Sequence, residues 1–355
     1  MIPVYLLSPA GKLLHRVQAL SASFSRKIDD VGTFSLTCEI PPDIGPDYRI
    51  KLDFPGESDV IWLVEDTEDV ILGNRRLLSV TGSDGKLMYE KRFVFAYGDT
   101  AEGYKIDYPA RICSDLINEQ MVTPVLGGSI RTLYGLIEAV PPEGVLSGAT
   151  AWEGEVCWRK LWDVFKEQME FGRATGLPFF VDLVAESSDG PGLVPLIGRR
   201  PGVERRLTSV QLNQFGISVR RVMRSSDNAE TVFALGSGEG SLALYSKYPS
   251  TILDYYPQAD PFWYKEDILT QGNEDDLDAL AKAATAAYQE HKTRTVLVVE
   301  NGAPVENFWG TLIGYGDLVT VEHFGIEQTV TVTAYTLEWD AGGEPSVSFA
   351  LEEGY

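Results

Sequence analysis

The chain has 355 residues and a formal charge of −22, and 44% of its residues are hydrophobic. This length exceeds what one ordinary core fills, so we expect two to four folded domains. The acidic surface argues against a protein that grips duplex nucleic acid or an anionic membrane. It is explained either by solvation alone or by a functional wall that repels polyanions.

The cysteines and the amino terminus indicate a protein folded in a reducing compartment. Cys38, Cys113 and Cys157 are far apart and never form a C-x-x-C spacing, so they predict neither a disulfide framework nor a zinc site. The first residues contain a four-residue apolar run without a basic flank, which predicts neither a signal peptide nor a membrane anchor.

Residues 1–95 are predicted to form a first β domain. After a turn ending at Gly32, the apolar residues Phe34, Leu36, Cys38 and Ile40 alternate with polar ones, which indicates a strand with one buried face. Cys38 is therefore interpreted as a small core residue.

Residues 96–190 are predicted to form a small α/β insertion. Pro109 stands where a helix could begin, since proline is favoured at the first helical position. A second helix is predicted to end at Gly172 or Gly176. Its buried stripe follows helical spacing and consists of Trp158, Leu161, Trp162, Phe165 and Met169.

Residues 191–250 are predicted to supply further strands, and they interrupt the acidic trend. The stretch 199–224 carries a net charge of +6, which leaves about −28 for the rest. These arginines either pair with carboxylates of the same subunit or bind the acidic surface of a neighbouring subunit. Nucleic acid is a weaker alternative, because no aromatic residues are interleaved among them. The arginines are Arg199, Arg200, Arg205, Arg206, Arg220, Arg221 and Arg224.

Residues 251–294 are predicted to form an aromatic loop followed by a helix capped near Asn273. The aromatic side chains either pack the loop onto its own domain or form a protein interface, with sugar stacking as a minor alternative. They are Tyr255, Tyr256, Phe262, Trp263 and Tyr264.

Residues 295–355 are predicted to end in an antiparallel meander of three short strands, part of a small barrel or sandwich. The buried faces of these strands are predicted from a spacing of two. The residues are Val319 and Val321, then Val330, Val332 and Ala334, then Val347, Phe349 and Leu351.

The search for reaction chemistry finds no catalytic, cofactor-binding or metal-binding motif. The three histidines lie outside H-E-x-x-H spacing, and there is neither a G-x-S-x-G elbow nor a P-loop. The glycines between Gly236 and Gly240 run into a strand, so they predict a hairpin turn. We therefore expect a chain without enzymatic activity and without cofactors.

Four passages together resemble the hub, or tail-tip, proteins of long-tailed bacteriophages, a group that includes the central hub of contractile-tail baseplates. The first is RKIDDVGTFSLTCEIPP, with glycine before an alternating strand. The second is LLSVTGSDGKLMYEKRFV, which is similar to a V-x-G-x-D…R pattern, here Val80, Gly82, Asp84 and Arg92. The third runs from Phe262 to His291, and the fourth is the closing segment with Gly-Asp-x-Val at 316–319.

The resemblance implies a β-rich, α+β fold with two small antiparallel β-barrel domains, an α/β insertion and a late helix. The first barrel would be 1–95, the insertion 96–190 and the closing barrel 295–355, with 191–250 adding strands and 251–294 the loop and helix. It also implies a homotrimer, whose six barrels would match a six-fold tail tube. Many relatives continue into a lysin, spike or fibre domain, whereas this chain stops at the barrel.

The implied role is that of a structural protein at the virion tail tip, made in the host cytoplasm and surrounding the channel through which DNA leaves. The expected partners are the distal tail or tail tube protein, the tape measure protein and a separate tip fibre or spike protein, with no membrane anchor and with DNA only in transit. The alternatives are a tail-associated peptidoglycan hydrolase and a distal tail adaptor or carbohydrate-binding adhesin.

Overall fold

The computed structural model describes most of the chain. The described residues are 2–39, 44–55, 57, 59–72, 75–95, 104–124, 132–133, 135–186, 192–199, 201–212, 218–224, 231–238, 243–248, 266–270, 276–291, 294–304, 309–323 and 325–352. Strands make up 48% of the structure and helices 19%, which confirms the predicted β-rich, α+β fold class. No helix in these ranges is long and apolar enough to cross a membrane.

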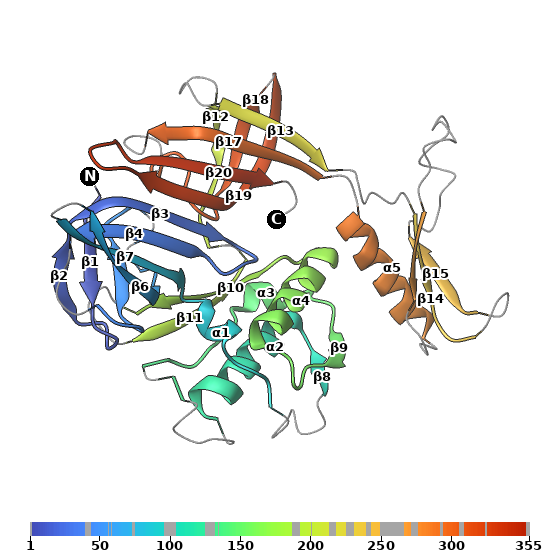
Figure 1. Ribbon diagram of the computed structural model, residues 1–355. Coiled ribbons are helices and arrows are strands. Elements are labelled where there is room, and N and C mark those ends of the chain that lie inside the picture. The colour runs from blue at the N-terminus through green and yellow to red at the C-terminus, as the bar shows by residue number, and fades with distance from the viewer. Residues whose placement is uncertain are drawn as a thin grey trace.

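The first β unit is an antiparallel sheet in the order β3-β4-β7-β6-β5-β1-β2 (Figure 1). The aromatic rings of Phe24, Phe34 and Trp62 meet in its core, with the Phe24 and Trp62 centroids 5.1 Å apart. Cys38 is fully buried there, which confirms its prediction as a core residue. The strands are β1 (Val4–Leu7), β2 (Leu13–Val17), β3 (Ala19–Lys27), β4 (Thr33–Glu39), β5 (Arg49–Leu52), β6 (Trp62–Leu72) and β7 (Arg75–Asp84).

The second β unit has the order β13-β17-β20-β19-β18-β12, and all its pairings are antiparallel except the parallel pair β12 and β18. The predicted meander corresponds to β18, β19 and β20. The strands are β12 (Glu204–Gln211), β13 (Ser218–Arg224), β17 (Arg294–Pro304), β18 (Leu318–His323), β19 (Ile326–Trp339) and β20 (Ser346–Glu352).

One position of the predicted meander is wrong. The register of β19 against β20 shifts between Val332 and Ala334, so the side-chain alternation changes face at this point. Ala334 is only half-buried, and Tyr335 and Leu337 occupy the core instead.

A single ladder joins the two β units. β3 pairs antiparallel with the second half of β19, from Ala334 opposite Lys27 to Trp339 opposite Ala22. The Trp339 ring stacks on Phe24 at 5.9 Å, and one hydrophobic core runs through both units. The two sheets are therefore parts of one 13-stranded sheet, with a seam between β3 and β19.

A helical unit with its own core packs below the first β unit in Figure 1. Helix α2 begins at Pro109, as predicted, and packs against α4. The elements are α1 (Leu87–Glu90), β8 (Tyr104–Asp107), α2 (Pro109–Ile117), the π-helical turn η2 (Asn118–Val122), α3 (Glu143–Leu146), β9 (Trp152–Glu155), α4 (Leu161–Ala174), β10 (Phe180–Ala185) and β11 (Leu193–Gly198).

The predicted stripe of this second helix is wrong at its first member. Helix α4 starts at Leu161, after an extended residue at Lys160, so Trp158 lies outside the helix. Leu161, Trp162, Phe165 and Met169 are buried as predicted, whereas 67% of Trp158 is exposed.

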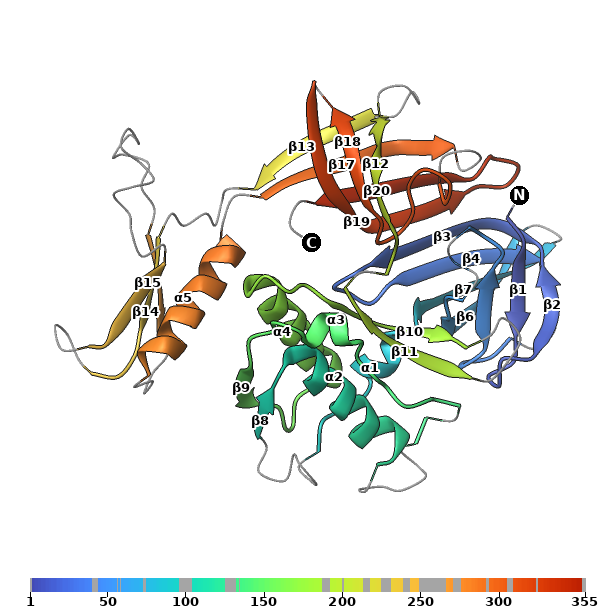
Figure 2. The same ribbon diagram turned by 180° about the vertical axis from the view of Figure 1, so that it is seen from behind.

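A smaller sheet, β15-β14-β16, lies apart from the other units and is covered by α5 (Figure 2). Leu280 and Ala284 of the helix pack against Ala234 of β14. Of the strands between 191 and 250, β11 pairs with β10 in the helical unit, β12 and β13 join the second β unit, and β14 and β15 belong to this sheet. The elements are β14 (Thr231–Leu235), β15 (Tyr245–Tyr248), β16 (Glu266–Thr270) and α5 (Leu277–His291).

Candidate functional site: a hydroxyl face across the seam

Five neighbouring strands, β20, β19, β3, β4 and β7, expose serine and threonine on the side opposite their core. Because strand side chains alternate, residues such as Phe24 and Leu36 point inward while their neighbours point outward. We call the outward residues the hydroxyl face. They are Ser21, Ser23, Ser25, Thr33, Ser35, Thr37, Ser79, Thr81, Thr336, Glu338, Ser346 and Ser348. Except for Glu338, all are serine or threonine. The next outward residue of β3 after Ser25 is the exposed Lys27, whose Nζ lies 3.8 Å from Asp30.

The strand register aligns these side chains in rows that cross the seam. In one row, Thr336 lies opposite Ser25, which lies opposite Thr33. The Thr336 hydroxyl donates to the Ser25 oxygen at 3.2 Å, and the Ser23 hydroxyl donates to Glu338 Oε1 at 3.3 Å. Side-chain hydrogen bonds therefore tie the two β units together on this face.

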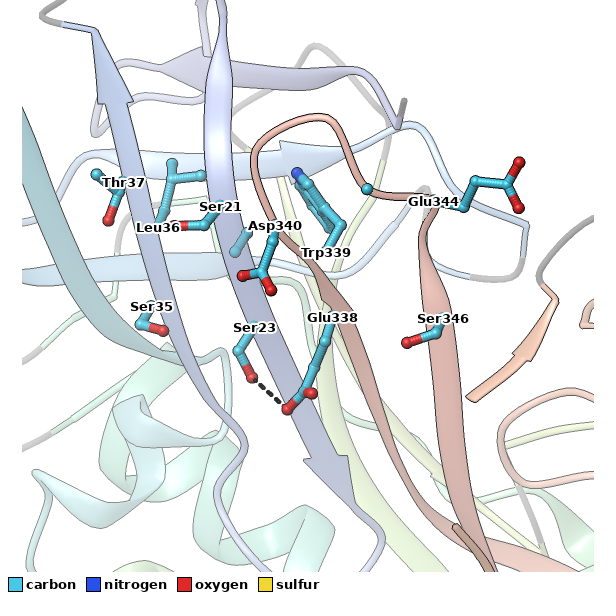
Figure 3. A pocket seen from close by; sticks show the side chains of 12 residues that line it. Ser21, Ser23, Ser35, Leu36, Thr37, Glu338, Trp339, Asp340, Glu344 and Ser346 are labelled. Carbon is cyan, nitrogen blue, oxygen red and sulfur yellow. Dashed lines mark hydrogen bonds between the residues drawn. The ribbon is translucent and has the colours of Figure 1, made fainter. Parts of the chain in front are cut away.

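A pocket of about 430 Å³ opens on the hydroxyl face beside the turn between β19 and β20 (Figure 3). The turn is closed by the Gly343 amide, which donates to the Asp340 carbonyl at 2.9 Å, and Gly342 supplies the positive φ of +81°. Glu338, Asp340 and Glu344 line the pocket together with the hydroxyls. The pocket is therefore acidic and rich in hydrogen-bonding oxygen atoms.

A second polar cluster is buried where the helical unit meets the β units. We call it the Arg26 cluster; its members are Arg26, Glu57, Asp84, Lys86 and Asp182. Arg26 lies 3.2 Å from Glu57 and 3.8 Å from Asp84, and it also bonds Asp182 of β10. Lys86 lies 3.3 Å from Asp84 and donates to the Lys27 carbonyl.

Aromatic side chains enclose the Arg26 cluster. The Arg26 guanidinium lies 4.5 Å from the Tyr315 ring centroid, which brings the second β unit into the cluster. The Tyr89 hydroxyl donates to the Asp182 carbonyl at 3.1 Å. Segments from three units therefore converge on one buried cation.

Burial dominates the ionisation of these acids. It raises the pKa of Glu57 to about 7, although the charge of Arg26 opposes the shift. Burial also raises the pKa of Asp84, with Lys86 acting in the opposite direction. Perturbed carboxyls can mark a catalytic site. Here the side chains of Glu57 and Asp84 are each only 1% exposed, so a substrate has no access and the cluster's role is to hold the units together.

The predicted arginines are spread over several elements. Arg205 of β12 donates through Nε to Asp317 at 2.6 Å, and Asp317 also accepts the Val203 amide at 2.7 Å. Arg199 donates through Nε and Nη2 to the Gly144 carbonyl of α3. Arg205 thus pairs with a carboxylate of its own chain, whereas Arg199 binds a backbone carbonyl.

The remaining predicted residues lie at the surface or outside the described structure. Arg220 and Arg221 are exposed on β13, while the backbones of Arg206 and Arg224 lie in β12 and β13. The residues outside the described ranges are Arg200, Tyr255, Tyr256, Phe262, Trp263 and Tyr264.

Sequence reasoning missed both the hydroxyl face and the Arg26 cluster. The repeated serines of Ala19–Lys27 and Ser346–Glu352 are visible as an alternating pattern, but they gain meaning only when β19 pairs with β3. The sequence pattern V-x-G-x-D does contain two residues that the structure shows to be important, Gly82 and Asp84. Gly82 approaches β6 so closely that a Cβ would lie 1.9 Å from the Leu63 carbonyl oxygen, and Asp84 belongs to the Arg26 cluster.

Comparison with protein-family models finds no match, and neither does comparison with curated protein sequences. Solved structures do match along nearly the whole chain. The 43 kDa tail protein of prophage MuSo2 from Shewanella oneidensis has a TM-score of 0.62 at 14% identity, covering 98% of both chains. A tail protein from Neisseria meningitidis has a TM-score of 0.59 at 14% identity, covering 99% of this chain and 96% of that one. A chain of the phage P2 baseplate in its activated conformation has a TM-score of 0.50 at 10% identity, covering 100% of this chain and 99% of that one.

The chain therefore has the fold of phage tail proteins. The resemblance predicted from its turn and strand patterns is confirmed at the level of the fold.

Proposed function

We propose that this chain is a structural protein of a phage tail, located at the tail tip, where three copies form a ring that joins the six-fold tail tube to a three-fold tip. The observation that carries this proposal is the match to tail proteins over nearly the full length of the chain. The tail or tube protein above the ring, the tape measure protein and a separate fibre or spike protein are its expected partners.

The two β units joined at the seam support the ring. Three copies with two such units each present six curved sheets, which is the symmetry that a six-fold tube requires. Because β3 and β19 hydrogen bond along one ladder, the two units of a copy are held in a fixed relative position.

We assign the hydroxyl face to the wall of the central channel. A wall that lets DNA pass must not hold phosphates, and phosphates are held mainly by lysine and arginine. The hydroxyl residues are neither, Lys27 at the end of β3 is paired with Asp30, and Glu338, Asp340 and Glu344 add negative charge at the pocket. Their repulsion of DNA acts over a Debye length, about 8 Å at physiological salt.

Lysines placed on this face test the assignment. Ser23, Ser35 and Thr81 lie in one row on adjacent strands. Assembled rings of the triple variant S23K/S35K/T81K are expected to bind linear duplex DNA, whose end can enter a channel, and to bind closed circular DNA no better than the wild type. The measurement is fluorescence anisotropy at fixed salt.

A matched control carries three lysines on other exposed positions: Leu13, Leu14 and Ile71. The control variant L13K/L14K/I71K is expected to bind linear and circular DNA equally. If the hydroxyl-face variant also binds both equally, the face does not line a channel.

The pocket favours a second candidate function. Its carboxylates and hydroxyls could bind a sugar, as expected of an adaptor or adhesin, or serve a peptidoglycan hydrolase.

We propose a non-enzymatic role, because the similar structures are tail and baseplate proteins. Clearing of host cell walls by the purified chain that disappears in an E338Q variant would favour the hydrolase instead. Glycan binding by a monomeric chain would favour the adhesin.

A further inference from the structure

A small aromatic patch projects from the helical unit beside the start of α4. Two segments pair there: the Trp158 amide donates to the Val94 carbonyl at 2.8 Å, and the Val94 amide donates to the Arg159 carbonyl at 3.0 Å. Val94 points into the core, and its neighbours Phe93 and Phe95 point outward. We call Phe93, Phe95 and Trp158 the Trp158 patch.

Trp158 is exposed at a conformational cost. Its φ is +61°, in the left-handed region that bulky side chains rarely adopt, and Asp47 is the other non-glycine residue with positive φ in the described part of the chain. The neighbouring Cys157 and Leu161 are both buried, so the backbone is fixed on either side. Strained residues are concentrated at functional sites, so this conformation makes Trp158 a candidate for one.

The rings form a defined surface. Trp158 meets Phe95 edge to face, with centroids 5.3 Å apart and planes at 67°. Trp158 is 67% exposed and Phe93 is 48% exposed. Tryptophan and other aromatic residues at the centre of an interface contribute most of its binding energy.

Three ion pairs involve residues close to the patch in the sequence. Arg159 lies 2.6 Å from Glu167, Lys160 lies 3.6 Å from Glu90, and Lys91 lies 3.7 Å from Glu65. The patch thus has an aromatic centre and a polar rim in which three cations are paired with carboxylates and Arg92 is half-buried beside Phe93. An aromatic centre with a polar rim is the anatomy of a protein interface.

We infer that the Trp158 patch is a contact between adjacent copies of this chain in the ring, an inference that rests on the proposed function. Copies with a charge of −22 repel one another wherever acidic surfaces meet, so they can associate only where acids are balanced by bases. The patch satisfies this condition and adds a rigid aromatic anchor. In a three-fold ring the contact is heterologous, so the patch meets a different surface of the next copy.

Nucleic acid is a poorer occupant. A groove for single strands combines aromatic rings with an excess of positive charge. Here Arg159, Lys160 and Lys91 are already paired with carboxylates.

The substitution Trp158→Gly separates the strain from the contact. Glycine adopts positive φ without steric strain, which offsets the entropy that it adds to the unfolded chain and the loss of the Phe95 contact, so the isolated W158G chain is expected to melt within a few degrees of the wild type. Its association is expected to weaken at least tenfold, because the anchor is lost. Mass photometry and analytical ultracentrifugation measure the association, and differential scanning calorimetry at dissociating concentrations measures the melting temperature. The variant F93S, which leaves φ at Trp158 unchanged, is expected to weaken association as well.

The control is I71S, which removes a 77% exposed isoleucine from β6, and its association constant is expected to equal that of the wild type. A wild-type ring whose association constant is unchanged in both W158G and F93S overturns the inference and leaves the proposed ring intact. Loss of another tail protein or of DNA from an intact ring would also overturn it, because the patch would then bind that partner. A wild-type chain that stays monomeric at all concentrations contradicts both the ring and the inference.

Discussion

At the scale of single residues, the buried charges of the Arg26 cluster determine how stability depends on pH. Two cations, Arg26 and Lys86, face three carboxylates, which are Glu57, Asp84 and Asp182. The cluster therefore has a net charge of −1 when all five groups are ionised. Tyr335 and Tyr315 lie close enough to interact with Glu57 and Arg26. A buried excess charge is costly unless it is protonated.

This predicts a loss of stability from acidic to neutral pH. The pKa of Glu57 rises from 4.5 in the unfolded chain to about 7 in the folded one, so its contribution to folding is complete below pH 4.5 and is lost as the pH rises through about 7. The shift corresponds to a few kcal/mol. Urea denaturation at pH 5, 6, 7 and 8 is expected to show a decreasing free energy of unfolding in the wild type, and a smaller decrease in E57Q.

The control for this prediction is E344Q, which alters an exposed carboxylate at the pocket. Its pH profile is expected to run parallel to that of the wild type. Identical slopes for E57Q and the wild type would show that Glu57 does not titrate in this range.

Gly82 gives a second prediction at this scale. A Cβ at this position would lie 1.9 Å from the Leu63 carbonyl oxygen and 2.6 Å from the Phe34 ring. Since neither the strand backbone nor the packed ring can yield, Gly82→Ala is expected to cost about 2 kcal/mol or more, or to prevent folding. Thermal denaturation checks it against Gly45→Ala, whose nearest contact would be 3.7 Å from Tyr48. Equal melting temperatures of the two variants would contradict the close approach of β6 and β7.

At the scale of elements, the parts that the sequence predicted well are those governed by local alternation. The core faces of β4, β18 and β20 follow from residues two apart, and α2 follows from Pro109 and the apolar spacing after it. The prediction of core residues failed where the backbone geometry interrupts the regular spacing of side chains along a strand or helix. The bulge after Val332 moves Ala334 off the core face, and the left-handed residue Trp158 leaves the predicted helical stripe.

The candidate site was beyond sequence reasoning because it depends on contacts distant in the chain. Ser23 meets Glu338, and Arg26 meets Asp182, only after β3 has paired with β19 and the helical unit has docked. No local pattern encodes these pairs. Arg205 was predicted as a candidate interface residue, but its partner Asp317 could be identified only from the structure.

The Asp317 link makes β12 a testable element. Asp317 is buried and accepts both the Arg205 guanidinium and the Val203 amide at the start of β12. Removing this carboxylate leaves the Val203 amide and the Arg205 Nε without their acceptor, while Arg205 keeps the Thr311 and Gly310 carbonyls, so the cost is expected to be about 1–3 kcal/mol. In D317A, amide hydrogen exchange is expected to accelerate in β12 and to remain unchanged in β4. The control D340A removes an exposed carboxylate of the pocket turn, and faster exchange of β12 in that variant would contradict a specific role of Asp317.

At the scale of the whole molecule, the chain places its surface chemistry on separate faces. The hydroxyl face crosses the seam between the β units, the Trp158 patch lies on the helical unit, and the exposed arginines Arg220 and Arg221 lie on β13. In the ring that we propose, a subunit requires one face toward the channel and others toward its neighbours, and these separate faces would meet that requirement.

The most direct test of this account is electron cryomicroscopy of the assembled protein, with each copy traced in the density. We expect three copies around a channel, with Ser23, Ser35 and Thr336 facing the lumen. A ring of another copy number, or a trimer whose hydroxyl face points outward, would contradict the account.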